Sequence, residues 1–390
     1  MDPIIALMQG VLDIVRDDNS GSPASYIPEL AAVEPDRLGF AVVGPRGHVR
    51  SVGDDDVEFT IQSISKPFVL AHVLSRIGLD AVMERVGTEP SGEPFNAISL
   101  EEGTGKPANP MVNAGAIATT GLVEGGGVDD RTERIVRTLS AFAGRSLHID
   151  ESVYRSESTT GDRNRALGHL MRSYGIVDAP VDVALETYFR QCSIAVTVRD
   201  LAVMAGTLAF GGLNPLTHER VVEERVARDV LSIMSSCGMY DFSGEWLLRV
   251  GLPAKSGVSG GVLAVAPSQF GVAAYSPRLD RHGNSVRGQA IVTALSDRMG
   301  MHLLEPHESI SQPIVDVVDT DEGRTIRLSG ELGFAAAERV LAVLRDVALV
   351  VPPGAVIRVD AREVGRAHPA ALAALKTEID AIPGDVRIIE

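Results

Sequence analysis

Ser63 and Lys66 are spaced so that they can act together as a nucleophile and its base. They lie in the stretch Thr60-Ile-Gln-Ser-Ile-Ser-Lys-Pro-Phe68, and positions i and i+3 share one helix face, with Cβ atoms about 5–6 Å apart. Pro67 has no backbone N–H and is tolerated only near a helix start, so Ser63 is predicted at the helix entrance. The positive end of the helix dipole disfavours an ammonium there, and burial lowers the pKa of a lysine further. The pattern therefore predicts a serine activated by a lysine.

Because Ser-x-x-Lys also occurs by chance at solvated helix starts, the other polar motifs matter. Asn113 closes an Asn-Pro-Met-Val-Asn stretch in apolar surroundings, where a buried amide must be hydrogen-bonded; the alternative is a capped turn. Glu157 and Asn164 flank a polar loop that can present a carboxylate and an amide to a ligand, or be a plain surface loop. Tyr188 and Tyr240 stand beside polar neighbours, although a tyrosine is more often a core residue.

A run of small residues from Ala254 to Gly261 allows the backbone to approach a ligand closely. A backbone N–H in this run is a candidate donor to an oxyanion. Its Lys-Ser-Gly, placed before an expected strand, parallels the Lys-Thr-Gly of penicillin-binding enzymes, which share Ser-x-x-Lys. The order and spacing of the two motifs predict a β-lactamase-like fold.

The elements that position these residues come from both ends of the first 305 residues. Alternating apolar residues predict a hairpin early in this part and a second one late. A short strand at 58–61 leads into Ser63, the region 72–240 is mainly helical, and a helix at 289–304 closes the part. The expected hairpins are 38–43 with 48–52, and 261–266 with 269–275. Separate two-stranded hairpins are marginally stable, so we expect an α/β domain whose single sheet is built from both chain ends, with the helical part packed beside it.

The remaining residues form a second, smaller module. The polar run 305–313 is bracketed by prolines and is interpreted as a linker. Beyond it, strands are expected at 314–318, 325–328, 355–359 and 386–389, and helices at 335–346 and 369–381. The predicted domains are therefore 1–305, a linker at 306–313, and a small α/β domain at 314–390.

Charge and composition narrow the class of partner. The chain of 390 residues has a net charge of -16 and no dense Lys/Arg run, which argues against nucleic acid and acidic membranes. Cys192 and Cys237 form no CxxC and are expected to be reduced; His302 and His307 lack a cysteine pair for a zinc site. No uncharged apolar run reaches the length of a membrane span, and the start of the chain is an amphipathic helix rather than a signal peptide. We expect a cytoplasmic protein.

In combination, these motifs resemble those of the bacterial-type glutaminase family. The resemblance covers roughly residues 5–305 and rests on five stretches in uninterrupted order: Gln62-Ser-Ile-Ser-Lys-Pro-Phe68, Asn109-Pro-Met-Val-Asn-Ala-Gly-Ala116, Tyr154 to Ala166, Tyr188-Phe-Arg-Gln-Cys-Ser193, and Lys255-Ser-Gly-Val-Ser-Gly-Gly261. Tyr26, within Ser-Tyr-Ile-Pro, stands where the family has a tyrosine near its site.

The resemblance implies hydrolysis of L-glutamine to L-glutamate and ammonia through a glutamyl ester, without a cofactor. It implies that Ser63 is the nucleophile, that Lys66 is its base, and that Lys66 or a tyrosine such as Tyr240 gives the leaving ammonia its proton. The implied substrate contacts are Ser63, Tyr26, Asn113, Glu157, Asn164, Tyr188, Tyr240 and the backbone of Val258. Family members usually form dimers or tetramers, so a homodimer or homotetramer is expected.

The tail module resembles STAS domains of the anti-sigma-factor-antagonist type. In those regulators a serine near the start of the second helix accepts phosphate, but the stretch Arg366-Ala-His-Pro-Ala370 has none. The expected role is therefore binding of a protein partner or of another subunit. Two other functions are compatible with parts of the sequence: a β-lactam hydrolase or peptidase with the same nucleophile pair, and a regulatory protein with an inactive hydrolase domain.

Overall fold

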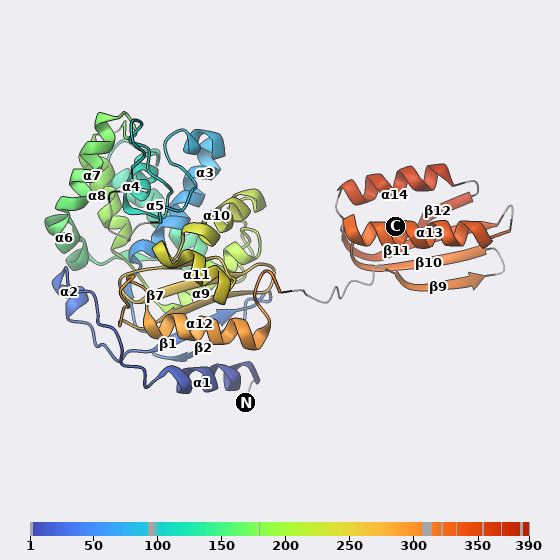
Figure 1. Cartoon of the computed structure of the whole chain (residues 1–390), viewed down its shortest axis with the longest axis horizontal. Helices are drawn as coiled ribbons and strands as arrows, with labels where there is room; N and C mark the ends of the chain where they lie inside the picture. The colour runs from blue at the N-terminus through green and yellow to red at the C-terminus, as the bar shows by residue number, and fades with distance from the viewer. Residues whose placement is uncertain are drawn as a thin grey trace. The chain divides into compact units, whose positions relative to one another are not determined.

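The computed structural model describes residues 3–92, 98, 100–178, 180–305, 314–320, 323–332, 334–352, 355–367, 369–382 and 385–389. The chain divides into two compact units, Met1–Glu305 and Pro306–Glu390 (Figure 1). The expected linker at 306–313 lies outside the described residues. No helix in the described part of the chain is long and apolar enough to cross a membrane.

A five-stranded antiparallel sheet forms the centre of the first unit. Its strands are β1 (Gly39–Val43), β2 (Val49–Gly53), β6 (Ala254–Ser256), β7 (Gly261–Ala266) and β8 (Phe270–Tyr275), in the order β2-β1-β8-β7-β6. Both predicted hairpins are present, and β1 pairs with β8, with Gly39 opposite Tyr275. The prediction of one sheet built from both chain ends is therefore confirmed.

Helices cover both faces of this sheet, which explains why β1 is buried along its whole length. Phe40 and Val42 face a cluster shared with α1 (Pro3–Val15) and α12 (Val286–Met299), whereas Ala41 between them faces a cluster shared with α9 (Val198–Ala209). Figure 1 shows α1 and α12 together on one side of the strands. Helix α12 begins earlier than the predicted 289–304 because the side chain of Ser285 caps its first turn, and it ends earlier, at Met299, where Gly300 adopts a left-handed conformation.

The helical part lies beside the sheet and carries most of the polar motifs. Its helices are α2 (Pro28–Ala31), α3 (Lys66–Met83), α4 (Asn113–Gly121), α5 (Val128–Ala143), α6 (Glu151–Thr160), α7 (Asp162–Ser173), α8 (Val181–Cys192), α10 (Glu224–Cys237) and α11 (Ser243–Arg249), with the 3-10 turns η1 (Gln62–Ser65) and η2 (Tyr240–Phe242). The predicted strand at 58–61 is shorter and joins a separate small sheet. This sheet has the order β3 (Phe59–Thr60), β5 (Ile194–Val196), β4 (His148–Ile149), and it fixes the chain just before η1.

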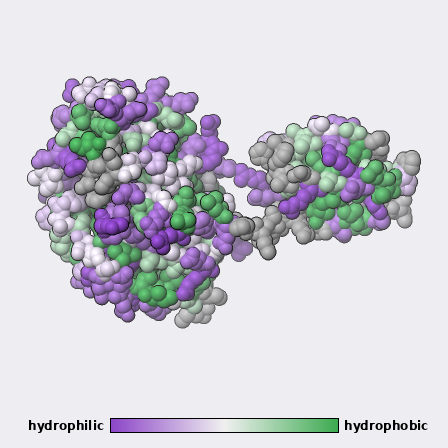
Figure 2. All heavy atoms as spheres, viewed as in Figure 1, coloured by the Kyte–Doolittle hydropathy of each residue, from purple (hydrophilic) through white to green (hydrophobic). Residues whose placement is uncertain are grey.

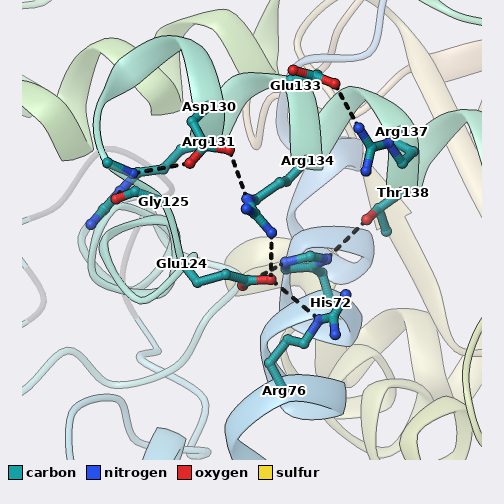
Figure 3. A network of polar contacts seen from close by, with 11 residues as sticks. His72, Arg76, Glu124, Gly125, Asp130, Arg131, Glu133, Arg134, Arg137 and Thr138 are labelled. Atoms are coloured by element: carbon teal, nitrogen blue, oxygen red, sulfur yellow. Dashed lines mark hydrogen bonds and ion pairs between the residues drawn. The ribbon is translucent and has the colours of Figure 1, made fainter.

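A polar network ties α3, the helix that follows Ser63, to α5 (Figure 3). His72 on α3 is 7% exposed, and its ring nitrogens lie 2.9 Å from Thr138 Oγ1 and 3.0 Å from Glu124 Oε2. Arg76 and Arg134 each place a nitrogen 3.3 Å from Glu124 Oε1. Because a buried polar group is costly to leave unpaired, the two hydrogen bonds of His72 favour this position of α3 against α5.

The second unit is a four-stranded sheet with two helices. Its strands are β9 (Ile314–Thr320), β10 (Gly323–Leu332), β11 (Val356–Ala367) and β12 (Asp385–Ile389), in the order β12-β11-β10-β9, and its helices are α13 (Phe334–Val350) and α14 (Pro369–Ala381). Strands β10, β11 and β12 run parallel, and β9 is antiparallel to β10. The helices share an apolar core with β10 and β11. The six expected elements occur in the expected order, and the STAS resemblance stays a prediction.

Candidate active site

Ser63 lies in the short turn η1 between strand β3 and helix α3, at the helix entrance that Pro67 indicates. The residue before it, Gln62, has a φ of 48°, a left-handed conformation that is uncommon for a residue other than glycine. Ser65 Oγ donates to the Gln62 carbonyl at 2.7 Å, and Gln191 Nε2 donates to Ser65 Oγ at 3.1 Å. Buried hydrogen bonds therefore hold the strained turn that presents Ser63.

Lys66 is buried, with 2% of its surface exposed, at the first position of α3. Its Nζ donates to Asn113 Oδ1 at 2.8 Å and to the Met111 carbonyl at 3.2 Å. Burial lowers the pKa of Lys66 from 10.5 to about 8. About a tenth of the amine is thus neutral at pH 7, and only this neutral form can act as a general base.

Tyr240 is a hydrogen-bond partner of Ser63. Its φ is 59°, and hydrogen bonding to Ser63 partly offsets the burial that raises the pKa of Tyr240 to about 12. Its hydroxyl also donates to the Ser256 carbonyl at 3.2 Å. The phenol therefore keeps its proton and lies against the hydroxyl of the expected nucleophile.

Lys255, the first residue of the Lys-Ser-Gly motif, is a second buried lysine at the site, and no role was predicted for its side chain. Its Nζ lies 4.1 Å from the centroid of the Tyr240 ring and donates to the Ser256 carbonyl at 2.8 Å. Burial, followed by the charge of Lys66, lowers the pKa of Lys255 well below its usual value. The signal that points to this residue is the Lys-Ser-Gly motif itself.

Glu157 places a buried carboxylate against the same turn. Its Oε1 accepts from Tyr26 Oη at 2.7 Å and from Gln62 Nε2 at 3.0 Å. Burial raises the pKa of Glu157, although these two hydrogen bonds oppose the change. Tyr26 is 49% exposed, but burial of its hydroxyl and the charge of Glu157 raise its pKa well above 10. Gln62 thus joins the carboxylate to the nucleophile turn, a role that the sequence analysis does not assign to it.

Asn113, Asn164 and Tyr188 form a third group, connected to Lys66. Asn113 Nδ2 donates to Asn164 Oδ1 at 3.2 Å, and Tyr188 Oη donates to Asn113 Oδ1 at 3.3 Å. Tyr188 is 3% exposed, and burial raises its pKa well above the usual value. Cys192, beside Tyr188, is a buried thiol, and burial raises its pKa to about 12. The thiol therefore stays protonated and is not a nucleophile at the site.

Val258 lies in the turn between β6 and β7, and strand β6 packs against η1. Gly257, just before it, lies close to the nucleophile turn: a Cβ atom added at this glycine would lie 3.1 Å from the carbonyl oxygen of Ile61. The glycine therefore allows the backbone around Val258 to approach this turn. The donation of the Val258 N–H to an oxyanion stays a prediction.

Eight of the nine sequence-predicted residues are thus linked in groups by hydrogen bonds around η1, and the ninth, Val258, lies in the turn after β6. The described residues contain no cluster of three His, Cys, Asp or Glu side chains that would hold a metal ion. The arrangement combines a serine at a strained helix entrance, a buried lysine, proton-bearing tyrosines, a carboxylate and two amides. Such a set can perform acyl transfer on a small amide that carries its own charged groups.

Comparison with known proteins agrees with this chemistry. The glutaminase family model matches residues 21–304. A glutaminase of Corynebacterium efficiens is 46% identical over 346 residues, which cover 88% of this chain and 82% of that protein. A glutaminase of Trichormus variabilis is 48% identical over 303 residues, covering 78% of this chain and 91% of that protein. The crystal structure of Mglu in its glutamate form covers 100% of this chain and 99% of that one, at a TM-score of 0.91 and 36% identity.

The fold and site define a mixed α/β, β-lactamase-like enzyme, and the chain belongs to the glutaminase family. It is an amidohydrolase.

Proposed function

We propose that this chain hydrolyses L-glutamine to L-glutamate and ammonia with Ser63 as nucleophile and Lys66 as its base. The observation that carries the proposal is the burial of Lys66 at the helix entrance that presents Ser63, with a pKa of about 8 and a hydrogen bond to Asn113. The family match is the second support for glutamine as substrate.

In the first step the Ser63 hydroxyl gives its proton to the neutral Lys66 amine, and its oxygen attacks the side-chain carbonyl carbon of glutamine. The oxyanion that forms accepts hydrogen bonds from the backbone N–H groups of Ser63 and Val258. These hydrogen bonds strengthen as negative charge develops on the oxygen. Asn113 keeps the amine oriented, since its Oδ1 accepts from Lys66 Nζ.

In the second step the carbon–nitrogen bond breaks and ammonia leaves with a proton from Lys66 or Tyr240. Tyr240 suits this role because its pKa of about 12 keeps it protonated and its hydroxyl is hydrogen-bonded to Ser63. Water then attacks the glutamyl ester and gives up a proton to the base, and the serine oxygen leaves with a proton, so glutamate is released and Ser63 is restored.

The α-groups of the substrate are bound by the remaining polar residues. Glu157 is the only acidic side chain among the expected contacts, and it supplies the anion that an α-ammonium group requires. The amides of Asn113 and Asn164 and the hydroxyl of Tyr188 supply donors for the α-carboxylate. Buried polar groups of this kind discriminate strongly, because a wrong ligand leaves them unpaired.

We expect glutamine to be preferred over asparagine by a factor on the order of a hundred or more in kcat/KM. A site that fixes both α-groups leaves the asparagine amide about one methylene short of Ser63, and a misplacement of about 1 Å can cost a hundredfold. Ammonia release from the two amides, with nitrocefin as a third substrate, measures this. Comparable values for the two amides would contradict the assignment of the α-group contacts, and nitrocefin turnover would favour the β-lactam hydrolase alternative.

We also expect the second unit to be dispensable for the chemistry. All site residues lie before Gly261. The match to the Trichormus variabilis glutaminase spans 91% of that protein but only 78% of this chain. A fragment of residues 1–311 should retain glutamine hydrolysis, whereas its oligomeric mass or partner binding changes. Light scattering and ammonia release on one sample measure both properties. A folded, soluble fragment without activity would mean that the second unit helps to build the site.

The expected assembly is a homodimer or homotetramer, and the expected location is the cytoplasm. Both follow from the family resemblance and from the sequence. Light scattering of the full chain and cell fractionation test them.

A further inference from the structure

The second unit contains an apolar cavity of about 360 Å³. Its walls come from the sheet, through Leu328 and Val359, and from the two helices, through Val340, Leu344 and Leu375. Hydrophobic residues also reach the surface of this unit, as Figure 2 shows for the face turned to the viewer. Small-molecule sites are typically cavities of about 300–1,000 Å³ with mostly apolar walls and a few placed polar groups. This cavity has the size and lining of such a site.

Lys376 interrupts the apolar stripe of α14 that lines the cavity. Leu372, Leu375, Lys376 and Ile379 all line it and are spaced i, i+3, i+4 and i+7, the pattern of one helix face. Leu372 is 51% exposed, so this face reaches the cavity mouth. Lys376 occupies a position of this stripe where an apolar residue is expected. Its ammonium group lies beside the opening, and its methylene groups lie along the wall.

Arg362 lines the cavity because strand β11 contains a β-bulge at this point. Between the pairs Arg327–Asp360 and Ser329–Glu363, β11 contains one more residue than β10. Such a bulge redirects a side chain, and the adjacent residues Ala361 and Arg362 both line the cavity.

The guanidinium of Arg362 is held by the Asp360 carboxylate through two hydrogen bonds of 2.8 and 2.6 Å. The pair orients the guanidinium at the cavity mouth, although 65% of the Arg362 side chain is exposed to solvent. Of the described residues that line the cavity, the two that carry a charge, Arg362 and Lys376, are both cations.

We propose that this cavity binds an amphipathic carboxylate, a molecule with an unbranched apolar chain of about ten carbons and one anionic head. The chain occupies the space between sheet and helices, and the carboxylate pairs with Lys376 at the mouth. A neutral chain of the same length fills the same volume but gives Lys376 no anion to pair with, so the charge of the head determines the preference.

Isothermal titration of the full-length protein with decanoate, below its micelle concentration, tests the proposal. We expect saturable binding of one decanoate per chain, and binding of decanol weaker by about tenfold, because a hydrogen bond to a charged group is typically worth one to two powers of ten in affinity. Lys376→Met keeps the apolar stem and should weaken decanoate binding by about tenfold, with no effect on decanol. Lys376→Arg should preserve the preference for decanoate.

Lys106→Met, which removes a lysine of the first unit, is the matched control and should leave decanoate binding unchanged. Circular dichroism of the full chain confirms that each variant is folded. Absence of saturable decanoate binding to the folded chain overturns the proposal. Equal affinity for decanol and decanoate, or equal effects of Lys376→Met and Lys106→Met, overturn it as well.

Discussion

Replacing Ser63 by alanine is expected to reduce kcat for glutamine by several powers of ten, up to about a millionfold. The residue acts as a unit with Lys66, and the loss of its oxygen removes the atom that forms the glutamyl ester. The fold should persist, since Gln62 and the turn around it are held by the hydroxyl of Ser65 rather than by that of Ser63. Ammonia release from the purified variant measures the effect. A rate above roughly a tenth of the wild-type value would show that another group is the nucleophile.

Ser65→Ala provides a matched control two residues away in the same turn. It also removes one hydroxyl, but this hydroxyl donates to the Gln62 carbonyl and accepts from Gln191, so its loss should lower stability by about 1–3 kcal/mol. We expect Ser65→Ala to retain far more activity than Ser63→Ala. If the two variants lost activity equally, the geometry of the turn, rather than the Ser63 oxygen, would account for the loss. Stabilisation of Ser63→Ala by glutamate on heating would show that its substrate contacts remain in place.

Local sequence patterns were sufficient to predict the elements that carry Ser63 and Lys66. Pro67 limits where α3 can begin, so the helix entrance follows from one residue's missing N–H. The two hairpins follow from the alternation of their own side chains, and their union in one sheet follows from the instability of isolated hairpins. These are short-range rules, which is why they succeed without knowledge of the tertiary structure.

The role of Gln62 and the burial of Lys255 depend on contacts between segments that are distant in the sequence. Gln62 becomes important because its left-handed backbone turns the chain at Ser63 and its amide reaches Glu157, almost a hundred positions later in the sequence. Lys255 is buried because β6 lies at the edge of the sheet against η1 and under the Tyr240 ring. Contacts between distant segments also explain the difference at the strand expected at 58–61. This strand pairs with β5 and not with the large sheet, because packing between distant segments decides its partner.

Lys66→Met should abolish activity nearly as completely as Ser63→Ala. In the wild-type enzyme, the pH dependence of kcat/KM should follow the titration of Lys66. Only the neutral amine accepts the serine proton, so kcat/KM should rise about tenfold per pH unit below pH 8 and level off above it. Steady-state ammonia release across this range measures the profile. A rate independent of pH between about pH 6 and 9 would mean that Lys66 is not the base.

The same substitution should make the first unit more stable at neutral pH. The pKa of Lys66 is about 8 in the fold, below the ordinary value of 10.5, so folding disfavours the charged form. Below pH 8 the lysine is protonated in both states, and the full penalty, on the order of 3 kcal/mol, opposes folding; it diminishes between pH 8 and 10.5 and is absent above 10.5.

Lys66→Met removes this penalty but leaves the acceptors of Met111 and Asn113 without their donor, which offsets about 1–3 kcal/mol of the gain. We therefore expect a modest rise in unfolding temperature at about pH 7 that disappears or reverses at about pH 10.5. The fluorescence of Trp246, the one tryptophan of the chain and a buried residue of the first unit, reports this transition without contribution from the second unit. A variant equally destabilised at both pH values would show that Lys66 is charged and well paired in the fold, in which case it would not be available as a base.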